Sequence, residues 1–464
     1  MSPRRSRKVG PRFEQVGRFR PFEVVSPGFV ALTHPGGRTS GLVRSDHSPP
    51  APFLAVECEV VPRPRGQVAV GLAAGNGDRL VAFHDASRRR VGVEVRTGRM
   101  STVLAVARAP RRVRRLGFVL AENQPTVLVD AGRGWRALAT DKNRVAPRLD
   151  LRRPETLSRF TVAWGSLDGA VDVGALRAGV FGMAGLRDLH VVQHADGTPY
   201  TDADGRMFLT ATCAGPGFFT QAHWGVFAFD PDRVAVDGLE QTAHLFTRRD
   251  GMVLGDHAGQ LVRDGDTWHA AVSSWGDFTP QRGVHVRHLT TSADLLHGVH
   301  LLETRRTPMP TDRGSYDPGM TLIDGRWHVS YVESVSHRPS RFHPALAVGP
   351  EGAAHWTEGL ERVGEADDLD FTEGPVLARL DENWRVLASD GKARRYPAFD
   401  LRMRRVGDLD APYGTNLPHP NLVDLPGGGR LLVTFDGTPH RSRVLGYGTH
   451  GDVLVMRAQG PRRS

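Results

Sequence analysis

The stretch that decides the fold is residues 317–327, DPGMTLIDGRW. It opens with an acidic residue, continues through a short apolar run, and reaches an Asp-Gly turn before Trp327 starts a second apolar run. An Asp-Gly pair between apolar runs is a strong local signal for a β-hairpin. The same pattern recurs at residues 256–268, DHAGQLVRDGDTW, and at residues 373–384, EGPVLARLDENW, with turns about 60 residues apart.

Two weaker copies, residues 196–208 and 419–431, flank these three. A repeat near this length is typical of four-stranded propeller blades, so the sequence predicts a closed ring of five blades. The first strand of each blade would line the central axis. The residues that open the copies would then converge there: Asp196, Asp256, Asp317, Glu373 and His419. Carboxylates in one pocket raise one another's pKa, which separates an acid from a base. Alternatively, each Asp only starts a turn.

Residues 21–165 contain about eight closely spaced strands with alternating patterns, and in FLAVECEVV the residues Leu54, Val56 and Cys58 share one face. The predicted fold is therefore all-β: an N-terminal jelly roll or β-sandwich followed by a five-bladed β-propeller at 186–464. Residues 1–20 are predicted to be a basic disordered tail, and the Gly- and Ala-rich residues 166–185 a linker. The sandwich resembles the concanavalin-like domains attached to carbohydrate enzymes. It offers His84, Asp85, Trp135 and Trp164 as candidate ligands, although packing or turns explain each equally well.

The composition argues against several classes of partner. The net charge is +9, but only three of the basic residues are Lys, and Arg is spread along the chain as a GC-rich genome would produce. Without a nucleic-acid-binding motif, we expect no nucleic-acid partner. Two Cys, Cys58 and Cys213, allow no disulfide framework, and the His residues show no metal-ligand spacing. No apolar run of about 18 residues exists to span a membrane. The cytoplasm is the default location, and secretion remains open.

Three blade starts in series resemble the five-bladed glycosidases of glycoside hydrolase family 43: Asp317-Pro318, Glu373-Gly374-Pro375 and His419-Pro420-Asn421. The resemblance implies an inverting hydrolysis of an oligo- or polysaccharide. It also implies Glu373 as the general acid and Asp317 as the residue that orients it and tunes its pKa. Asp256 would be the base that activates water, although His257 follows it where the family has Pro. Asp196 is the alternative base.

Several residues are candidates for substrate binding: Asp196, His257, Trp275 and His419. Trp275 would stack on a sugar, whereas His419 would contact a hydroxyl or help to hold a cation or water on the axis. No cofactor is required and no metal site is predicted. Carbohydrate is the expected partner, and no oligomeric state is indicated.

Two other functions remain open at this stage. A family 130-like glycoside phosphorylase would use phosphate in place of water, with Lys392, Arg394 and Arg395 as candidate phosphate ligands. A propeller that only binds carbohydrate is the second alternative, because propellers often serve as docking platforms.

Overall fold

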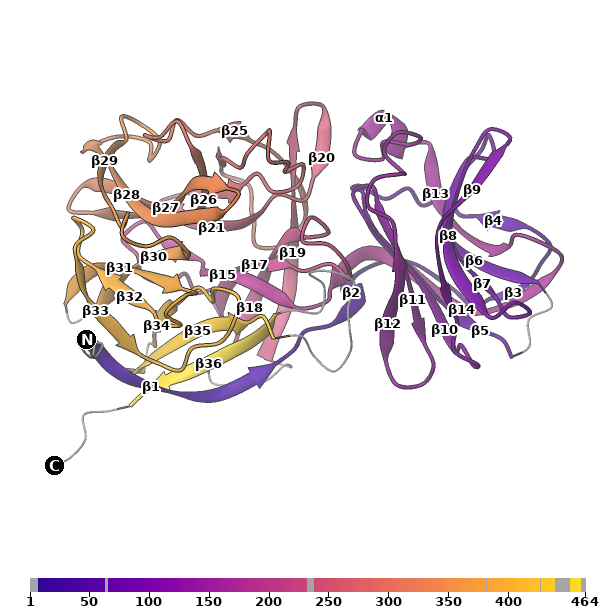
Figure 1. Cartoon of the computed structure of the whole chain (residues 1–464), viewed down its shortest axis with the longest axis horizontal. Helices are drawn as coiled ribbons and strands as arrows, with labels where there is room; N and C mark the ends of the chain where they lie inside the picture. The colour runs from indigo at the N-terminus through magenta and orange to yellow at the C-terminus, as the bar shows by residue number, and fades with distance from the viewer. Residues whose placement is uncertain are drawn as a thin grey trace.

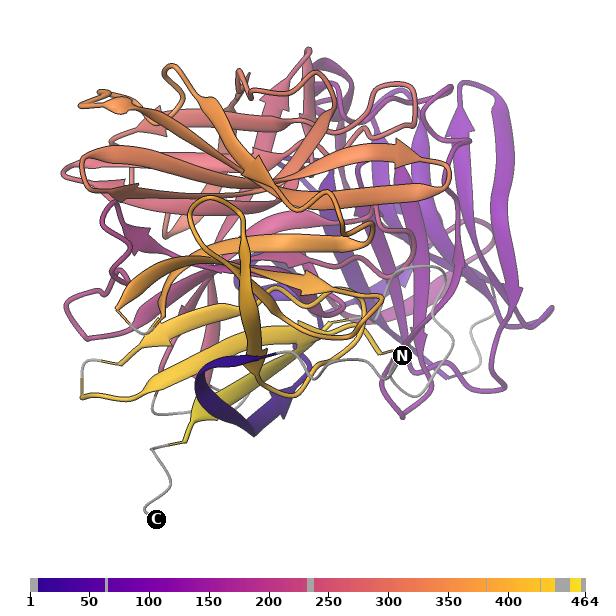
Figure 2. The same ribbon diagram turned by 60° about the vertical axis from the view of Figure 1, so that its left-hand side comes forward.

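The computed structural model describes residues 7–62, 66–231, 238–380, 382–425, 427–438 and 451–459. The chain is all-β, and it forms two lobes that lie side by side (Figure 1). Strands β2 to β14 make one lobe, and the later strands together with the first strand, β1, make the other, as the rotated view also shows (Figure 2). In the described part of the chain, the one helix, α1 (Pro154–Leu157), is a single short turn, and no helix is long and apolar enough to cross a membrane.

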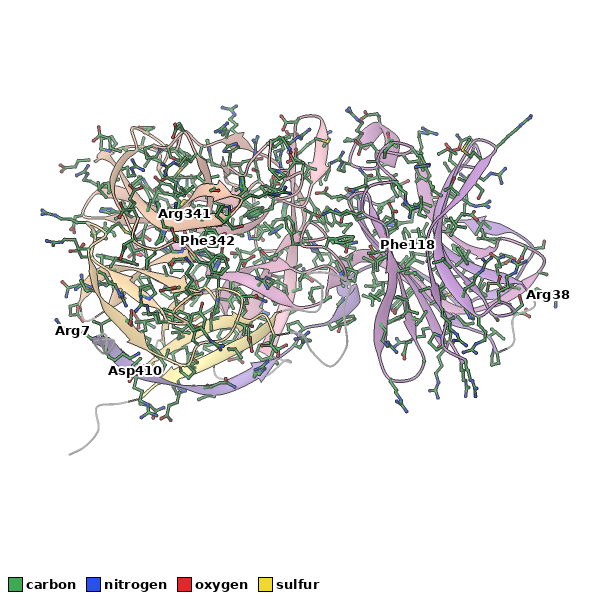
Figure 3. All side chains as sticks on the ribbon, in the orientation of Figure 1. Arg7, Arg38, Phe118, Arg341, Phe342 and Asp410 are labelled. Carbon is green, nitrogen blue, oxygen red and sulfur yellow. The ribbon has the colours of Figure 1, made fainter. Side chains whose placement is uncertain are left out.

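The N-terminal lobe consists of two antiparallel sheets that share one hydrophobic core. Phe118, labelled in Figure 3, is fully buried between them. The first sheet has the order β12 (Trp135–Thr140), β11 (Gln124–Asp130), β10 (Arg115–Ala121), β5 (Phe53–Val60), β14 (Val171–Met183) and β2 (Glu23–His34), with β3 (Gly37–Thr39) beside β14. The second has the order β4 (Leu42–Arg44), β13 (Phe160–Ser166), β6 (Gln67–Ala74), β7 (Arg79–Asp85), β8 (Arg90–Thr97) and β9 (Met100–Arg108).

The C-terminal lobe begins with two sheets. One has the order β15 (Leu186–Val191), β17 (Met207–Cys213), β18 (His223–Phe229), β19 (Leu239–Arg249) and β20 (Met252–Leu254), and β24 (Gly298–Glu303) pairs with β19. The next has the order β16 (Gln193–His194), β21 (His257–Asp264), β22 (Thr267–Ser273), β23 (Val286–Thr291) and β25 (Arg305–Arg306).

Two further sheets complete this lobe. The first is β26 (Gly314–Ile323), β27 (Arg326–His337), β28 (Ser340–Glu351) and β29 (Glu361–Glu365). The other has eight strands in the order β30 (Thr372–Leu380), β31 (Asn383–Asp390), β32 (Pro397–Phe399), β33 (Arg405–Asp410), β1 (Lys8–Phe19), β36 (Asp452–Ala458), β35 (Arg430–Asp436) and β34 (Asn421–Asp424). The first strands contact one another in series, β15 to β21, β26, β30 and β34, and β34 contacts β15 again. A ring of first strands therefore surrounds one axis.

The predicted disordered tail is wrong for residues 8–19, because they form β1; residues 1–6 lie outside the described part. β1 runs antiparallel to β36, pairing Phe13 with Ala458, and parallel to β33, pairing Lys8 with Asp408. Phe13 is 2% exposed in a core that includes Leu380 and Met456. The N-terminus thereby joins the last strands of the chain, visible where β1 runs beside β36 (Figure 1).

The predicted linker is also wrong, because β14 covers most of residues 166–185. β14 pairs with β5 on one side and β2 on the other, so it lies inside a sheet. Its Gly residues allow close packing: a Cβ at Gly179 would lie 2.2 Å from the Phe29 carbonyl oxygen. The Gly- and Ala-rich composition that indicated a linker instead reflects a crowded strand.

The two lobes are joined by packed rings and by buried hydrogen bonds. Phe53 of β5 stacks on Phe246 of β19 with ring centroids 4.8 Å apart. The amide of Gly255 donates to Glu122 Oε1 at 2.9 Å, and Gln124 donates to Thr220 at 2.8 Å. The turn between β10 and β11 thus docks against the C-terminal lobe.

Candidate active site

A bulge with a left-handed residue occurs near the start of four of the five axial strands. The residues are Asp188 (φ 49°), Ala258 (φ 55°), Asp317 (φ 49°) and Gly374 (φ 63°). The strand register shifts at each of them. A non-Gly residue in this conformation costs on the order of 1 kcal/mol or more, and such strain concentrates at functional sites. The bulges therefore mark one end of the axis as the place to look for chemistry.

Side chains from three axial segments meet at this end. Asp317, Glu373 and His419 each offer a ligand-type atom within 4.8 Å of the others. His419 Nε2 lies 3.4 Å from Asp317 Oδ2 and 3.7 Å from Asp188 Oδ1. Asp188 thus brings a third carboxylate to the cluster. We call these four residues, Asp188, Asp317, Glu373 and His419, the axial cluster.

Hydrogen bonds fix the two carboxylates that come from β26 and β30. The amide of Gly374 donates to Asp317 Oδ2 at 3.3 Å, and the Asp317 amide donates to Ser273 Oγ at 2.9 Å. The Tyr316 hydroxyl donates to Glu373 Oε2 at 3.3 Å. Adjacent strands therefore hold Asp317 and Glu373 in fixed positions.

The electrostatics of the cluster separate its carboxyl groups. Burial, reinforced by the negative charge of Asp188, raises the pKa of Glu373 to about 8. Burial and the charges of Glu373 and Asp188 also raise the pKa of Asp317 well above its ordinary value. Around neutral pH, Glu373 therefore holds a proton, and the same causes disfavour ionisation of Asp317.

The pKa of Asp188 shifts in the opposite direction. Burial opposes its ionisation, but His419 and Arg187 favour it, so the pKa of Asp188 falls below its ordinary value. Because burial lowers the pKa of His419 to about 4, the imidazole is neutral near pH 7. The Arg187 guanidinium, which stays charged at every working pH, then sustains the Asp188 carboxylate. The cluster therefore favours ionisation of Asp188 and disfavours ionisation of Glu373 and Asp317.

Glu373 opens onto a pocket of about 510 Å³. Arg187 and Arg394 line this pocket with Glu373, and the remaining lining residues are Phe371, Gly391, Tyr413, Gly414, Thr415, Asn416 and Leu417. The volume lies within the range of small-molecule sites, about 300 to 1,000 Å³. The protonated carboxyl thus faces a space that can admit a ligand.

Aromatic rings pack behind Glu373. Trp275 meets Tyr316, the hydrogen-bond partner of Glu373, edge to face with ring centroids 5.1 Å apart. Trp275 also lies 5.0 Å from Phe278 and stacks at 6.5 Å on His257. Trp275 therefore packs against the hydroxyl partner of Glu373, and its predicted role as a sugar platform stays a prediction.

The structure brings together three of the predicted site residues, Asp317, Glu373 and His419. His257 lies at the edge of the cluster, where it interacts electrostatically with Asp188 and hydrogen-bonds the Gly255 carbonyl oxygen at 2.8 Å. Burial lowers the pKa of His257 below its ordinary value. Two predicted residues lie elsewhere.

Asp256 is not in the axial cluster, which contradicts the placement predicted for it. It is fully buried, and its oxygens accept hydrogen bonds from Arg249 Nε (2.7 Å), Arg249 Nη2 (2.8 Å), Thr247 (2.7 Å) and the Gly276 amide (3.0 Å). A carboxylate committed to a buried ion pair has no lone pair directed at substrate or water. Asp256 therefore belongs to a buried ion pair with Arg249 and not to the axial cluster.

Asp196 is also outside the cluster. Its Oδ1 accepts hydrogen bonds from the amide (2.9 Å) and hydroxyl (2.7 Å) of Thr198, the pattern of a turn-capping Asp. It lines a different pocket of about 390 Å³, shared with Gln193, Gln260 and Trp384. The prediction that Asp196 meets Glu373 is wrong, because Asp196 lies in the turn after the first axial strand.

Asp188 and Arg187 were missed by the sequence analysis although a signal for them exists. Asp196-Gly197 is itself a turn, and Asp188 precedes it much as Asp317 precedes Asp324-Gly325. The copy at residues 196–208 takes Asp204-Gly205, the later of the two turns, as its hairpin. Aligning on the earlier turn would have placed Asp188 at the start of an axial strand.

No family model matches the chain, and the search of curated proteins gives no significant match. Among solved structures, a Penicillium chrysogenum alpha-L-arabinanase complexed with arabinobiose is 12% identical, with 91% of this chain and 98% of that chain covered and a TM-score of 0.38. The GH43_1 enzyme from Xanthomonas citri is 14% identical, with 59% and 89% covered and a TM-score of 0.40. The GH93 alpha-L-arabinofuranosidase of Fusarium graminearum is 9% identical, with 87% and 97% covered and a TM-score of 0.37. At these identities and TM-scores, the likeness to these structures indicates no activity for this chain.

Proposed function

We propose that the protein is a glycoside hydrolase that cleaves its substrate with inversion, using Glu373 as general acid and Asp188 as general base. The observation that carries the proposal is the axial cluster itself, in which the carboxyl groups of Asp188, Asp317 and Glu373 gather around His419. Within it the pKa of Glu373 is raised and the pKa of Asp188 is lowered. Environments that push two carboxyl groups apart in pKa assign one to proton donation and the other to proton acceptance. Asp188 takes the role that the sequence analysis gave to Asp256.

The proposed reaction follows from these states. The Glu373 carboxyl gives its proton to the glycosidic oxygen as the bond from that oxygen to the anomeric carbon breaks. A water attacks the anomeric carbon from the opposite face and loses its proton to the Asp188 carboxylate. The products are a sugar with inverted configuration and an alcohol. Asp317 positions the acid through Gly374 and touches no reacting atom.

The fold that we propose for the C-terminal lobe is a five-bladed propeller. Five first strands contact one another in a ring, and the eight-stranded sheet contains two four-strand units, β30 to β33 and β34 to β36 with β1. The N-terminal strand β1 would complete the last blade and close the ring. We propose a β-sandwich for the N-terminal lobe because its two sheets share one core.

The proposed reaction requires no cofactor, but a cation or an ordered water would fit the axial cluster. Both ring nitrogens of His419 are buried without a hydrogen-bond partner among the described residues, and Asp317 and Glu373 offer oxygens close by. A cation there would favour ionisation of Glu373 and so weaken it as an acid. The reaction is therefore written without one.

A glycoside phosphorylase is the second candidate, because Arg394 lines the same pocket as Glu373. The other two predicted phosphate ligands are engaged in ion pairs, Lys392 with Asp370 at 3.2 Å and Arg395 with Asp390 at 3.1 Å. Of the three predicted phosphate ligands, only Arg394 lines the pocket, where it lies with Arg187. This keeps the phosphorylase as a candidate but favours the hydrolase. Turnover that requires inorganic phosphate would identify the phosphorylase.

The test is hydrolysis of a panel of nitrophenyl glycosides, with the configuration of the released sugar followed by proton NMR. We expect inverted product from the wild type, and a loss of about 10²-fold or more in kcat for Glu373→Gln and for Asp188→Asn. Asp196→Asn, an exposed carboxyl change in the same lobe, is the matched control and should keep full activity. Retained configuration, or equal activity in all variants, would refute the proposal. Glycan binding without turnover would indicate a non-catalytic binding protein.

A further inference from the structure

A large cleft lies at one end of the N-terminal lobe, in a different lobe from the axial cluster. Its volume is about 990 Å³. The lining comes from both sheets and from the connection between β9 and β10: Glu59, Val60, Val61, Pro62, His84, Ala86, Arg89, Pro110, Arg111, Arg112, Val113, Arg114, Arg115, Asp130, Gly132 and Gly134. The proposed glycosidase reaction uses none of these residues.

The cleft is strongly cationic. Five arginines line it against two carboxylates, and one of those carboxylates is already neutralised. Asp130 forms an ion pair with Arg115 Nη2 at 2.7 Å. It also accepts hydrogen bonds from the amides of Gly132 (2.6 Å) and Gly134 (3.1 Å). Within the described part of the chain, the remaining four arginines, Arg89, Arg111, Arg112 and Arg114, form no ion pair with a carboxylate. Four guanidinium groups against the one remaining carboxylate, Glu59, leave an excess of positive charge that attracts an anionic ligand.

A buried histidine adds a second feature that points to a ligand. His84 is 5% exposed, lines the cleft from β7, and has an Nδ1 with no hydrogen-bond partner among the described residues. A buried polar atom without a partner is costly, so native structures rarely leave one unless a ligand or water satisfies it. The imidazole nitrogen suits a hydroxyl group.

The lining also discriminates between polyanions. None of the described lining residues is Phe, Tyr or Trp, so the cleft lacks the large aromatic platforms on which successive bases of a single-stranded nucleic acid stack. The lining comes from the ends of strands in both sheets, and the volume is large enough for several sugar units. An acidic polysaccharide combines the required anions with the hydroxyl groups that His84 suits.

We propose that this cleft binds an acidic polysaccharide chain, whose carboxylate or sulfate groups contact Arg111, Arg112 and Arg114 and whose hydroxyl groups reach His84. The lobe would then hold the protein on anionic glycan whatever the axial cluster does. Binding at this cleft does not depend on the proposed glycosidase activity.

The test measures binding of the full chain to four probes by isothermal titration calorimetry: polygalacturonate, heparin, neutral arabinan and a single-stranded 20-mer DNA. The variant combines Arg111→Ala, Arg112→Ala and Arg114→Ala, all at exposed positions. The matched control combines Arg38→Ala, Arg44→Ala and Arg99→Ala, which removes the same charge from exposed positions in the same lobe outside the cleft. A His84→Gln variant tests the hydroxyl contact.

We expect polygalacturonate or heparin to bind, and the cleft variant to bind at least tenfold more weakly while the control keeps its affinity. Polygalacturonate alone would identify a carboxylate ligand, and heparin alone would identify a sulfate ligand. His84→Gln should weaken binding of the same probe. Equal losses in both triple variants, tighter binding of DNA, or no binding of either acidic glycan would overturn the proposal. The glycosidase assay is run separately, so its failure leaves this result unaffected.

Discussion

The amide of Gly374 donates a hydrogen bond to Asp317 Oδ2 at 3.3 Å, and this bond ties the strand that carries Glu373 to the neighbouring axial strand. Gly374 adopts φ 63°, and a Cβ there would lie 2.1 Å from the His419 ring. Only glycine therefore fits beside the acid. The position of Glu373 depends on a backbone conformation that Asp317 stabilises.

The first prediction concerns Asp317. Asp317→Asn retains a carbonyl oxygen that can accept from Gly374, whereas Asp317→Ala removes the acceptor. We expect kcat to fall about tenfold further in the alanine variant than in the asparagine variant, with little change in KM, because positioning of the acid acts on the chemical step. Steady-state kinetics on the best nitrophenyl substrate measures this. Equal losses in the two variants would show that the hydrogen bond to Gly374 does not position the acid.

The pH dependence of kcat/KM follows from the two shifted groups. The proposed mechanism requires a protonated Glu373 and an ionised Asp188. Because the pKa of Glu373 is raised to about 8, activity should fall as pH rises through about 8. Because the pKa of Asp188 is lowered, the acid limb should lie below the ordinary Asp value of about 3.9. A basic limb near pH 4.5 would mean that Glu373 has no raised pKa and is not the acid.

The hairpins of the C-terminal lobe could be predicted because their signals are local. The Asp-Gly turns after β21 and β26 fix where each strand ends, and the acidic residues that open two copies, Asp317 and Glu373, did reach one cluster. Asp256 and His257 are adjacent in the sequence, yet Asp256 pairs with Arg249 while His257 lies near Asp188, beside a bulge at Ala258. Sequence spacing alone does not reveal a bulge.

The remaining elements depend on partners far away in the chain. β1 pairs Lys8 with Asp408, and no local pattern in a basic N-terminal segment indicates such a partner. β14 contains several Gly and Ala residues, and its burial follows from strands on both sides of it. Asp188 was missed because the connection after β15 contains two Asp-Gly turns, and the sequence does not say which one ends the strand.

The role of β1 predicts an unusual sensitivity of the N-terminus to mutation. Phe13→Ala removes a side chain that is 2% exposed in the core between β1, β31 and β36, and should lower the free energy of unfolding by about 3 kcal/mol. Val16→Ala, at a position 49% exposed on the same strand, is the control and should change it little. Chemical denaturation followed by fluorescence measures both variants. Indistinguishable variants would mean that β1 contributes little to the stability of the lobe.

The contact between the lobes contains a buried acid, Glu122, whose titration should change the free energy of unfolding with pH. Burial raises the pKa of Glu122 from an ordinary value near 4.5 to about 8, although the Gly255 amide that donates to it acts in the opposite direction. The folded protein therefore holds a proton on Glu122 that the unfolded chain releases. The contribution of Glu122 to the free energy of unfolding should be fully present below about pH 4.5, and it should be lost as the pH rises through about 8.

Glu122→Gln tests this titration because the amide keeps an oxygen for Gly255 and cannot ionise. We expect the free energies of unfolding of the two proteins to be similar at pH 4.5, and the variant to be more stable by a few kcal/mol at pH 8. Urea denaturation at several pH values measures the difference in free energy of unfolding between the two proteins. Glu373 and Asp317, whose pKa values are also raised, are present in both proteins, so their contributions cancel in this difference. A constant difference across this range would show that Glu122 ionises in the folded protein as readily as in the unfolded chain.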